Sequence, residues 1–339
     1  MRFPLSLTSS LTSYLLKQRL RGRKRFPLVL MLEPLHACNL SCAGCGRIRE
    51  YADSMNSRLS LEECLASIDE CGAPVVSICG GEPLIYPEIG ELVRQTTARG
   101  KHVYLWTNGL RLEDKLDEFR PSPRLFINVH LDGMEATHDR LVGREGTFAA
   151  AVRGIEAAIA ARFQVTTNTT LYRDTNIREI AVLMEYLATL GVGGFMISPA
   201  YGYQAVEAGD PEGAERMFMT REEVYVKFRD ARRLLGDFRL TASPLYLEFL
   251  CGERQLRCAA WASPTRNVRG WRGPCYLIAD AHYPTYRALI DQTDWQRFSS
   301  GYDPRCADCL MHCGFEPAAV LAANRKFRDM MKMAVWQLT

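Results

Sequence analysis

The chain has 339 residues, of which 12 are cysteine, and its 42 Lys and Arg residues nearly balance its 39 Asp and Glu residues. This near-neutral charge argues against a dedicated nucleic-acid-binding protein. The sequence has no apolar run of about 18 residues and no secretory signal, so we expect neither a transmembrane helix nor export. Because an unexported chain stays in a reducing compartment, metal binding or catalysis explains the cysteines better than disulfides do.

Residues 1–27 form a basic segment. Residues 1–32 contain no acid and seven basic side chains: Arg2, Lys17, Arg19, Arg21, Arg23, Lys24 and Arg25. Leu7, Leu11, Tyr14 and Leu15 repeat at helical spacing, which predicts a helix with one apolar face. Such a helix either lies on an anionic membrane surface or packs against the open edge of the main fold.

Residues 28–200 alternate between predicted strands and helices. The strands are expected at Leu28–Leu32, Val75–Ile78, His102–Trp106, Leu125–His130, Gln164–Thr169 and Phe195–Ile197. The helices are expected near 60–72, 87–99, 111–118, 147–161 and 177–190. Repeated strand–helix units predict a parallel α/β sheet, either a partial open barrel or a doubly wound sheet, with ligands at the carboxyl ends of the strands.

Residues 201–339 form a C-terminal subdomain in which this alternation stops. We expect a loop at Tyr201–Gly213 and a helix at Arg221–Leu235, followed by short irregular pieces. Five cysteines of this subdomain form a possible auxiliary metal site: Cys258, Cys275, Cys306, Cys309 and Cys313. A second iron–sulfur cluster, a zinc ion and free buried thiols all remain open for them.

Cys38, Cys42 and Cys45 follow the first predicted strand in a C-x3-C-x2-C pattern. Three thiolates on one short loop can hold an iron–sulfur cluster and leave one iron open to a small molecule. A structural zinc site needs four ligands, and His36 is the one candidate nearby, so we favour iron–sulfur. An open iron indicates catalysis.

This cysteine pattern resembles that of the radical S-adenosylmethionine (radical SAM) enzymes. Gly80-Gly81-Glu82-Pro83 ends the second strand, where that family binds the methionine amino group, and Glu82 can pair with an ammonium. The resemblance implies further cofactor contacts at later strand ends: Asn108, His130, Asp132, Asn168 and Ser198. It also implies a partial (β/α)6 TIM-like barrel, a [4Fe–4S] cluster on the three cysteines, S-adenosylmethionine as cofactor, and a ferredoxin or flavodoxin as electron donor.

Within that family the chain most resembles the hopanoid-pathway adenosyltransferases, the adenosylhopane synthases. The similar segments run through both halves of the chain and include Leu16–Leu32, Glu70–Ile78, Thr166–Leu171, Pro264–Val268, Pro274–Leu277 and Cys306–Cys309. This implies addition of the 5′-deoxyadenosyl radical to the terminal alkene of hopene, a membrane-resident triterpene. It further implies a cytoplasmic enzyme peripheral to the inner face of the membrane. Another isoprenoid alkene or a peptide is the alternative substrate.

One residue departs from that resemblance. The adenosylhopane synthases usually have Cys-Thr-Asn-Ala at the end of the third strand, whereas this chain has Trp106-Thr107-Asn108-Gly109. A thiol there could give a hydrogen atom to the product radical, and an indole cannot readily do so. Trp106 is therefore expected in the substrate pocket, where it changes either the quenching group or the substrate, or simply packs in the wall.

Overall fold

The computed structural model describes residues 3–299, 302–323 and 325–338. One nine-stranded sheet runs through the described chain in the order β6-β5-β4-β3-β2-β1-β7-β8-β9. Its first six strands, all parallel, are β1 (Val29–Leu32), β2 (Val75–Ile78), β3 (His102–Thr107), β4 (Leu125–His130), β5 (Gln164–Leu171) and β6 (Phe195–Pro199). The predicted strands are confirmed to within two residues at each end.

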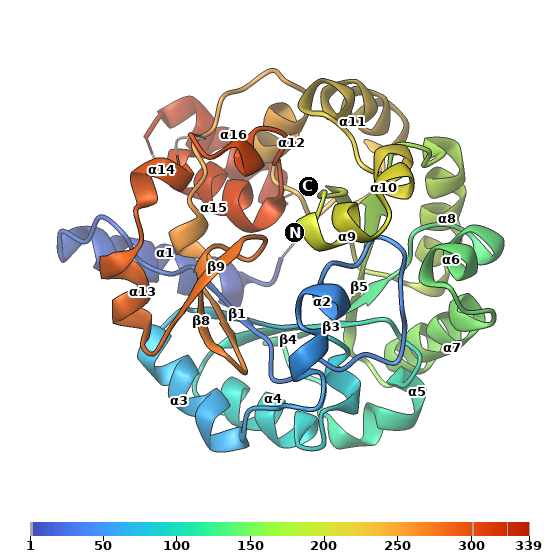
Figure 1. Ribbon diagram of the computed structural model, residues 1–339, viewed down its shortest axis with the longest axis horizontal. Helices are drawn as coiled ribbons and strands as arrows, with labels where there is room; N and C mark the ends of the chain where they lie inside the picture. Colours follow the sequence, from blue (N-terminus) through green and yellow to red (C-terminus); the bar gives the residue numbers. More distant parts are fainter. Residues whose placement is uncertain (1–2, 300–301, 324, 339) are drawn as a thin grey trace.

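Helices connect these strands, and most of them lie around the outside of the sheet, whereas the helix at Arg47–Glu50 lies on its inner side (Figure 1). They are α2 (Arg47–Glu50), α3 (Leu61–Cys71), α4 (Ile89–Ala98), α5 (Leu112–Lys115), α6 (Glu135–Val142), α7 (Thr147–Ala160) and α8 (Ile177–Leu190), with short 3-10 turns at Ala52–Ser54, Pro83–Ile85 and Leu116–Glu118. The Ser60 side chain and Glu63 form the capping box that begins α3, and Asn176 caps α8. The predicted partial TIM-like barrel is confirmed.

Each strand of the barrel has one face toward the surrounding helices and one face toward the lumen. On β5, Val165, Thr167, Thr169 and Leu171 are buried, and the residues between them are half-buried, as expected for a strand covered by helices on one side. The opposite face lines the lumen in layers, because Tyr104 pairs with Phe126, Trp106 with Asn128, and His130 with Asn168. Polar side chains therefore gather toward the carboxyl ends of the strands.

The C-terminal part continues the same sheet. β7 (Thr265–Asn267) pairs in parallel with β1, and β8 (Gly270–Pro274) and β9 (Ala279–Tyr283) follow in antiparallel order. The helices here are α9 (Gln204–Gly209), α10 (Pro211–Met217), α11 (Arg221–Leu235), α12 (Pro244–Leu250), α13 (Tyr286–Gln292), α14 (Trp295–Ser299), α15 (His312–Ala323) and α16 (Phe327–Leu338), with 3-10 turns at Ala260–Ala262 and Pro304–Cys306. The helix at Arg221–Leu235 is confirmed, and the loop expected at Tyr201–Gly213 is wrong because α9 and α10 occupy it.

The N-terminal helix α1 (Leu5–Leu20) packs under the barrel. Leu7 is buried against Val75 and Phe126, near the amino ends of β2 and β4, and Leu11 packs on the same cluster. Tyr14 and Leu15 pack on a second cluster around Phe26. The predicted apolar face therefore contacts the barrel, as the packing alternative expected. Arg2 lies outside the described residues.

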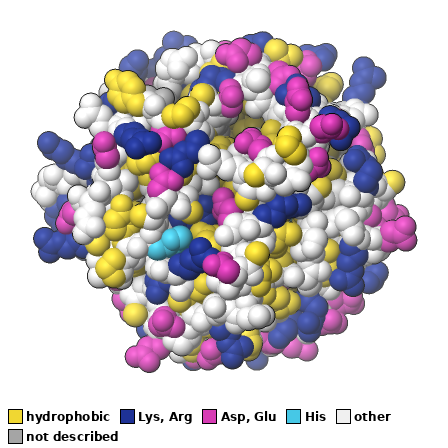
Figure 2. Space-filling model, in the orientation of Figure 1, with side chains coloured by type: hydrophobic (Ala, Val, Ile, Leu, Met, Phe, Trp, Pro, Cys, Tyr) yellow, Lys and Arg dark blue, Asp and Glu magenta, His cyan; other side chains and the backbone are white. Residues whose placement is uncertain are grey.

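The surface is mixed in charge. Figure 2 shows acidic and basic side chains interspersed over the face that it presents. Among the described residues, we find no helix that combines the length and the apolar character needed to cross a membrane.

Candidate functional site

The loop after β1 carries the three cysteines of the C-x3-C-x2-C pattern. Cys38, Cys42 and Cys45 are half-buried and free. The Arg49 guanidinium donates to the carbonyl oxygens of Cys42 and Cys45, at 3.3 and 2.6 Å, and so fixes the backbone between them. Burial, reinforced by neighbouring thiols, raises the pKa of Cys42, and burial raises that of Cys38 to about 11. Such thiols ionise only when a cation compensates the charge, as a bound metal does.

His36 does not join these cysteines. It is fully buried, its ring stacks on Tyr51 with centroids 3.9 Å apart, and its Nδ1 lies 3.1 Å from Ser54 Oγ. Burial lowers its pKa to about 4. The loop thus offers three thiols without this possible fourth ligand, which fits a cluster with one open iron.

Gly80 and Gly81 pass directly beside the cysteine loop. A Cβ on Gly81 would lie 1.8 Å from the Ala37 carbonyl oxygen, and Gly80 has a φ of +110°. The N–H of Gly81 donates to Leu35 O at 3.2 Å, and that of Glu82 donates to Ala37 O at 2.9 Å. Only glycine allows this approach, so the turn after β2 and the cysteine loop are positioned together.

Glu82 fixes this turn to β3. Its side chain is 1% exposed, and its oxygens accept from Thr107 Oγ1 at 2.7 Å and from the N–H groups of Asn108 and Leu84 at 2.8 and 3.0 Å. These three hydrogen bonds lower the pKa of the carboxyl group, but burial outweighs them and leaves the pKa raised. A methionine ammonium, the partner expected from the sequence, would have to share the carboxylate with these three donors. Pro83, also buried, begins the 3-10 turn that follows.

A polar network joins the ends of β4 and β5. His130 Nε2 lies 2.8 Å from Asp132 Oδ2, and Asn168 Nδ2 lies 3.0 Å from His130 Nδ1. Asp132 is 2% exposed and also accepts from the Thr170 N–H at 2.7 Å. Burial lowers the pKa of His130, but the Asp132 carboxylate and the two hydrogen bonds outweigh it and leave the pKa raised.

Two further predicted contacts lie at neighbouring strand ends. Asn108 Nδ2 donates to Asn39 Oδ1 at 2.7 Å and lies 4.0 Å from Cys38 Sγ, so this amide touches the cysteine loop. Ser198 is buried and pairs with Thr170 in the register of β5 and β6. The strand order therefore sets the predicted residues along one edge of the sheet, from the cysteine loop to β6.

Sequence reasoning missed the buried ion pair beneath the cysteine loop. Arg47 Nε lies 3.0 Å from Glu33 Oε1, and both side chains are nearly inaccessible. Arg47 Nη2 also donates to Tyr276 O at 2.5 Å, and the guanidinium stacks on the Tyr276 ring at 3.9 Å. In the sequence, this ion pair was indicated only by the position of Glu33 and Arg47 on either side of the cysteine motif. Charged residues are common on surfaces, so the two did not stand out.

Trp106, the predicted pocket residue, lies on β3 on the same face as Tyr104. It is half-buried, and its indole Nε1 is buried without a described hydrogen-bond partner. Its ring stacks on His312, at the start of α15, with centroids 6.1 Å apart and an interplanar angle of 22°. The barrel lumen and the C-terminal part meet at this contact.

The chain matches two family models. Residues 32–187 match the Radical SAM superfamily, and residues 195–333 match a domain of unknown function, DUF3463. The first range holds the three cysteines, the Gly80–Pro83 turn and the network on β4 and β5. The barrel therefore matches the radical SAM superfamily, and it uses a [4Fe–4S] cluster and S-adenosylmethionine.

Relatives and solved structures agree with this family. The chain is 27% identical over 323 residues to an AdoMet-dependent heme synthase of Oleidesulfovibrio alaskensis, covering 83% of this chain and 80% of that one. An AdoMet-dependent heme synthase of Methanosarcina barkeri is 32% identical over 176 residues, half the length of each chain. The crystal structure of Streptococcus suis SuiB superposes with a TM-score of 0.60 at 15% identity, covering 93% of this chain and 78% of that one. This last likeness shows the fold.

The described side chains fit both cofactors. The three thiols of the cysteine loop are close enough to influence one another electrostatically, and the Gly80–Gly81 backbone leaves room that a Cβ would fill. Asn168 Oδ1 is buried without a described partner and so can accept from a ribose hydroxyl or an adenine amine. No group of three or more His, Cys, Asp or Glu side chains in the described ranges is arranged to hold a single metal ion.

Proposed function

We propose that the chain transfers the 5′-deoxyadenosyl group of S-adenosylmethionine to the terminal alkene of hopene, giving adenosylhopane. When bound, the cluster supplies the electron that cleaves the carbon–sulfur bond of S-adenosylmethionine, and a ferredoxin or flavodoxin would supply that electron in turn. The protein's own part is to orient the cofactor, through Asn108, Asn168 and the Gly80–Gly81 backbone, and to exclude water from the lumen.

One observation carries the choice of hopene. The segments that resemble adenosylhopane synthases lie in both halves of the chain, and the C-terminal ones contact the cofactor side of the barrel. β7, within Pro264–Val268, pairs with β1, and Tyr276, within Pro274–Leu277, accepts from Arg47 next to the cysteine loop. The resemblance therefore extends to the walls around the site and not only to the barrel.

Trp106 bears on how such a reaction would end. Addition to an alkene leaves a carbon radical that needs a hydrogen atom, and the resembling enzymes have a cysteine at this position. An indole N–H is a poor hydrogen-atom donor, so another group must quench the product radical. Trp106 then acts as a wall residue that shapes the space for the alkene.

A membrane surface is the expected partner, because hopene resides in the bilayer. The face of α1 that contacts the barrel is unavailable, but α16 exposes Phe327, Met331, Val335 and Leu338 on one stripe, with exposed Arg325, Lys326 and Arg328 at its start. An apolar stripe beside basic residues favours binding in the interface of an anionic membrane. We therefore place the enzyme peripherally on the inner face of the cytoplasmic membrane.

The test is anaerobic incubation with S-adenosylmethionine, a low-potential reductant and the hopene diploptene, followed by mass spectrometry. We expect an adenosyl–lipid adduct with the natural chain and none with Cys42→Ala. Free 5′-deoxyadenosine without an adduct would contradict hopene as substrate. Other isoprenoid alkenes and peptides would then be screened with the same readout.

A further inference from the structure

Cys79 is a buried thiol on the lumen side of the barrel. It directly follows β2, and its N–H donates to Leu32 O at 2.9 Å, so the pairing with β1 continues to this residue. On the same strand, Val75 belongs to the buried cluster inside the amino-terminal end of the barrel. Because side chains alternate along a strand, Ser77 and Cys79 share the face of Val75. Cys64, by contrast, belongs to the apolar core around the helices, which does not include Cys79.

The strand register places Cys79 next to Trp106. β2 and β3 pair in parallel as far as Ile78 and Leu105, so the next pair along the two strands is Cys79 and Trp106. Trp106 in turn pairs with Asn128 on β4. These three side chains therefore form one layer of the lumen wall, directly below the strand ends that carry the predicted cofactor contacts.

Polar atoms around this layer lack partners. Trp106 Nε1, Asn128 Oδ1 and Ser77 Oγ are buried without a described hydrogen-bond partner, and Ser77 and Asn128 are only 2% and 3% exposed. Buried polar groups are nearly always paired, and the exceptions are typical of places where a ligand binds. The layer therefore has the character of a binding site rather than of packed core.

The surroundings of Cys79 keep its thiol protonated. Burial raises the pKa of Cys79, the Glu33 carboxylate raises it further, and Arg47 and a hydrogen bond from Tyr276 oppose the rise only in part. Only a protonated thiol has an S–H hydrogen atom to give. Because an S–H bond is weaker than a C–H bond, transfer of that atom to a carbon radical is favourable.

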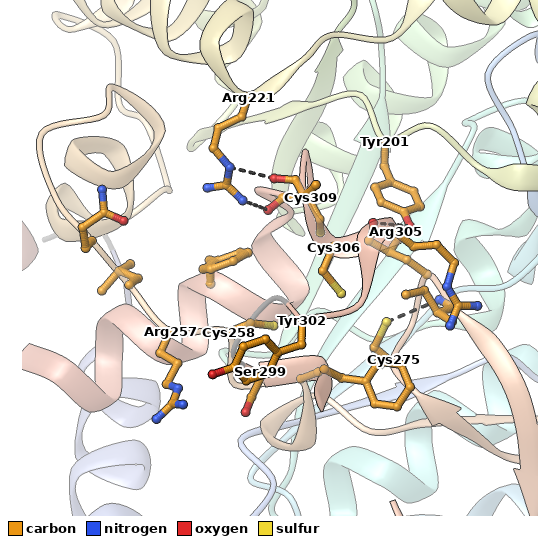
Figure 3. Close-up of a pocket in the computed structure, with 18 of the residues that line it drawn as sticks. Tyr201, Arg221, Arg257, Cys258, Cys275, Ser299, Tyr302, Arg305, Cys306 and Cys309 are labelled. Carbon is orange, nitrogen blue, oxygen red and sulfur yellow. Dashed lines mark hydrogen bonds between the residues drawn. The ribbon is translucent and has the colours of Figure 1, made fainter. Parts of the chain in front are cut away.

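The cysteines of the C-terminal part face another space. Figure 3 shows four of them around a cavity of about 850 Å³: Cys258, Cys275, Cys306 and Cys309. Burial raises the pKa of Cys313, and Cys275 and Cys309 raise it further, so the fifth cysteine of the predicted auxiliary set is their neighbour. The described residues that line this cavity include none from β1–β6. The cavity is therefore distinct from the layer of Cys79 and Trp106.

We propose that Cys79 is the hydrogen-atom donor of the lumen and quenches the carbon radical that addition to the alkene leaves. In this step the S–H bond breaks, a C–H bond forms on the product, and Cys79 is left as a thiyl radical. One electron from the ferredoxin or flavodoxin and one proton from solvent then restore the thiol. The proposal rests on the proposed addition, and it names the group that acts in place of the Trp106 indole.

Deuterium from heavy water tests this donor without any alkene. The exchangeable S–H hydrogen becomes deuterium, and without substrate the 5′-deoxyadenosyl radical takes its hydrogen from the nearest weak bond. We expect deuterium in the 5′-deoxyadenosine from the natural chain and from Cys64→Ala, a matched control in the apolar core, and loss of the label in Cys79→Ala. Equal labelling in Cys79→Ala, or no label from the natural chain, would overturn the proposal.

A second variant separates loss of the thiol from misfolding. Cys79→Ala/Trp106→Cys returns a thiol to the same layer from the neighbouring strand, so it should regain the label at the iron content of the natural chain. A double variant that stays unlabelled would contradict the placement of both residues in one layer, and with it the proposal.

The same experiment with diploptene connects the donor to the proposed function. The adduct from the natural chain should carry deuterium, and Cys79→Ala should still consume S-adenosylmethionine but lose the saturated adduct. Labelled 5′-deoxyadenosine without an adduct from the natural chain would contradict hopene as substrate and still support Cys79 as the donor. An equally labelled adduct from Cys79→Ala would overturn the role of Cys79 and leave the proposed function standing.

Discussion

His130, Asp132 and Asn168 make the most charge-sensitive contact of the candidate site. The Asp132 carboxylate raises the pKa of His130, so the folded chain favours the protonated imidazole more than the unfolded chain does. This stabilisation is complete below the unfolded pKa of about 6.5 and is lost as the pH rises through the folded value. Protonation of His130 therefore makes the stability of the strand ends depend on pH.

We predict that His130→Asn lowers the free energy of unfolding more at pH 6 than at pH 8. The measurement is urea denaturation at both values, with His282→Asn as a control, because burial and nearby arginines lower the pKa of that histidine. An equal loss at both values for His130→Asn would show that the ion pair with Asp132 does not form.

Gly81 offers a second test at the scale of one residue. A methyl group there would collide with the Ala37 carbonyl, so Gly81→Ala should move the turn away from the cysteine loop. We predict at least a tenfold loss of S-adenosylmethionine cleavage, about 1.4 kcal/mol or more in the barrier. Gly209→Ala, where a Cβ meets open space, is the matched control and should leave the rate unchanged. If both variants cleave S-adenosylmethionine at the rate of the natural chain, the turn is not part of the site.

Among the elements, α16 presents its apolar stripe to solvent. The stripe recurs every three or four residues. Trp336 on this helix packs on the ring of Phe3, just before α1, with centroids 5.7 Å apart, and Gln337 Nε2 donates to Thr8 Oγ1 on α1 at 3.0 Å. The two terminal helices therefore support one another at this surface. This position suits attachment to a bilayer in its interface region.

We predict that Val335→Asp weakens binding to vesicles that contain anionic lipid, measured by co-sedimentation. Val226→Asp on α11 is a close control, because both valines are 55% exposed. The adverse charge removes one apolar anchor and repels the lipid headgroups, so binding should fall several-fold in the first variant only. Equal binding by both variants and the natural chain would exclude α16 as the attachment site.

The elements of the barrel could be predicted because their sequence patterns are local. Alternating or continuous apolar runs marked the six strands, and the helices near 60–72 and 177–190 begin at the capping residues Ser60 and Asn176. The helices at Gln204–Gly209 and Pro211–Met217 were missed because glycines within and between them suggested a loop. A start signal was nevertheless present, since Asp210 precedes Pro211 and accepts from the Gly213 N–H at 3.0 Å.

The site was predictable where a motif fixes the chemistry and not where distant segments meet. The three cysteines and the Gly80–Pro83 turn follow directly from sequence spacing. The contact of Arg47 with Tyr276 joins residues 229 positions apart, and the three-residue strand β7 beside β1 is too short to show a pattern. Such contacts depend on the tertiary fold, which local periodicity does not encode.

At the scale of the whole molecule, α1 closes the amino-terminal end of the barrel. Leu7 is 4% exposed and packs on Val75 and Phe126, directly beneath the stacked rings of Tyr104 and Phe126. This packing covers the amino ends of β2 and β4, so the predicted cofactor residues lie at the opposite ends of the strands. The segment is thus part of the barrel's core.

We predict that Leu7→Ala lowers the free energy of unfolding by about 2–4 kcal/mol, because it leaves a cavity under the sheet. Leu16→Ala on the same helix should change it by less than about 0.5 kcal/mol, because Leu16 is 57% exposed. Chemical denaturation of both variants measures the difference. Equal effects would mean that α1 does not pack as described.

The central claim is that the Cys38–Cys45 loop and the strand ends beside it form one site that cleaves S-adenosylmethionine. The most direct measurement is 5′-deoxyadenosine formation by the reduced, iron-loaded chain, quantified by liquid chromatography and mass spectrometry. The account predicts the product, free or attached to lipid, from the natural chain and from Cys64→Ala, and none from Cys42→Ala. Equal product from Cys42→Ala, or none from a natural chain with its full iron content, would contradict it.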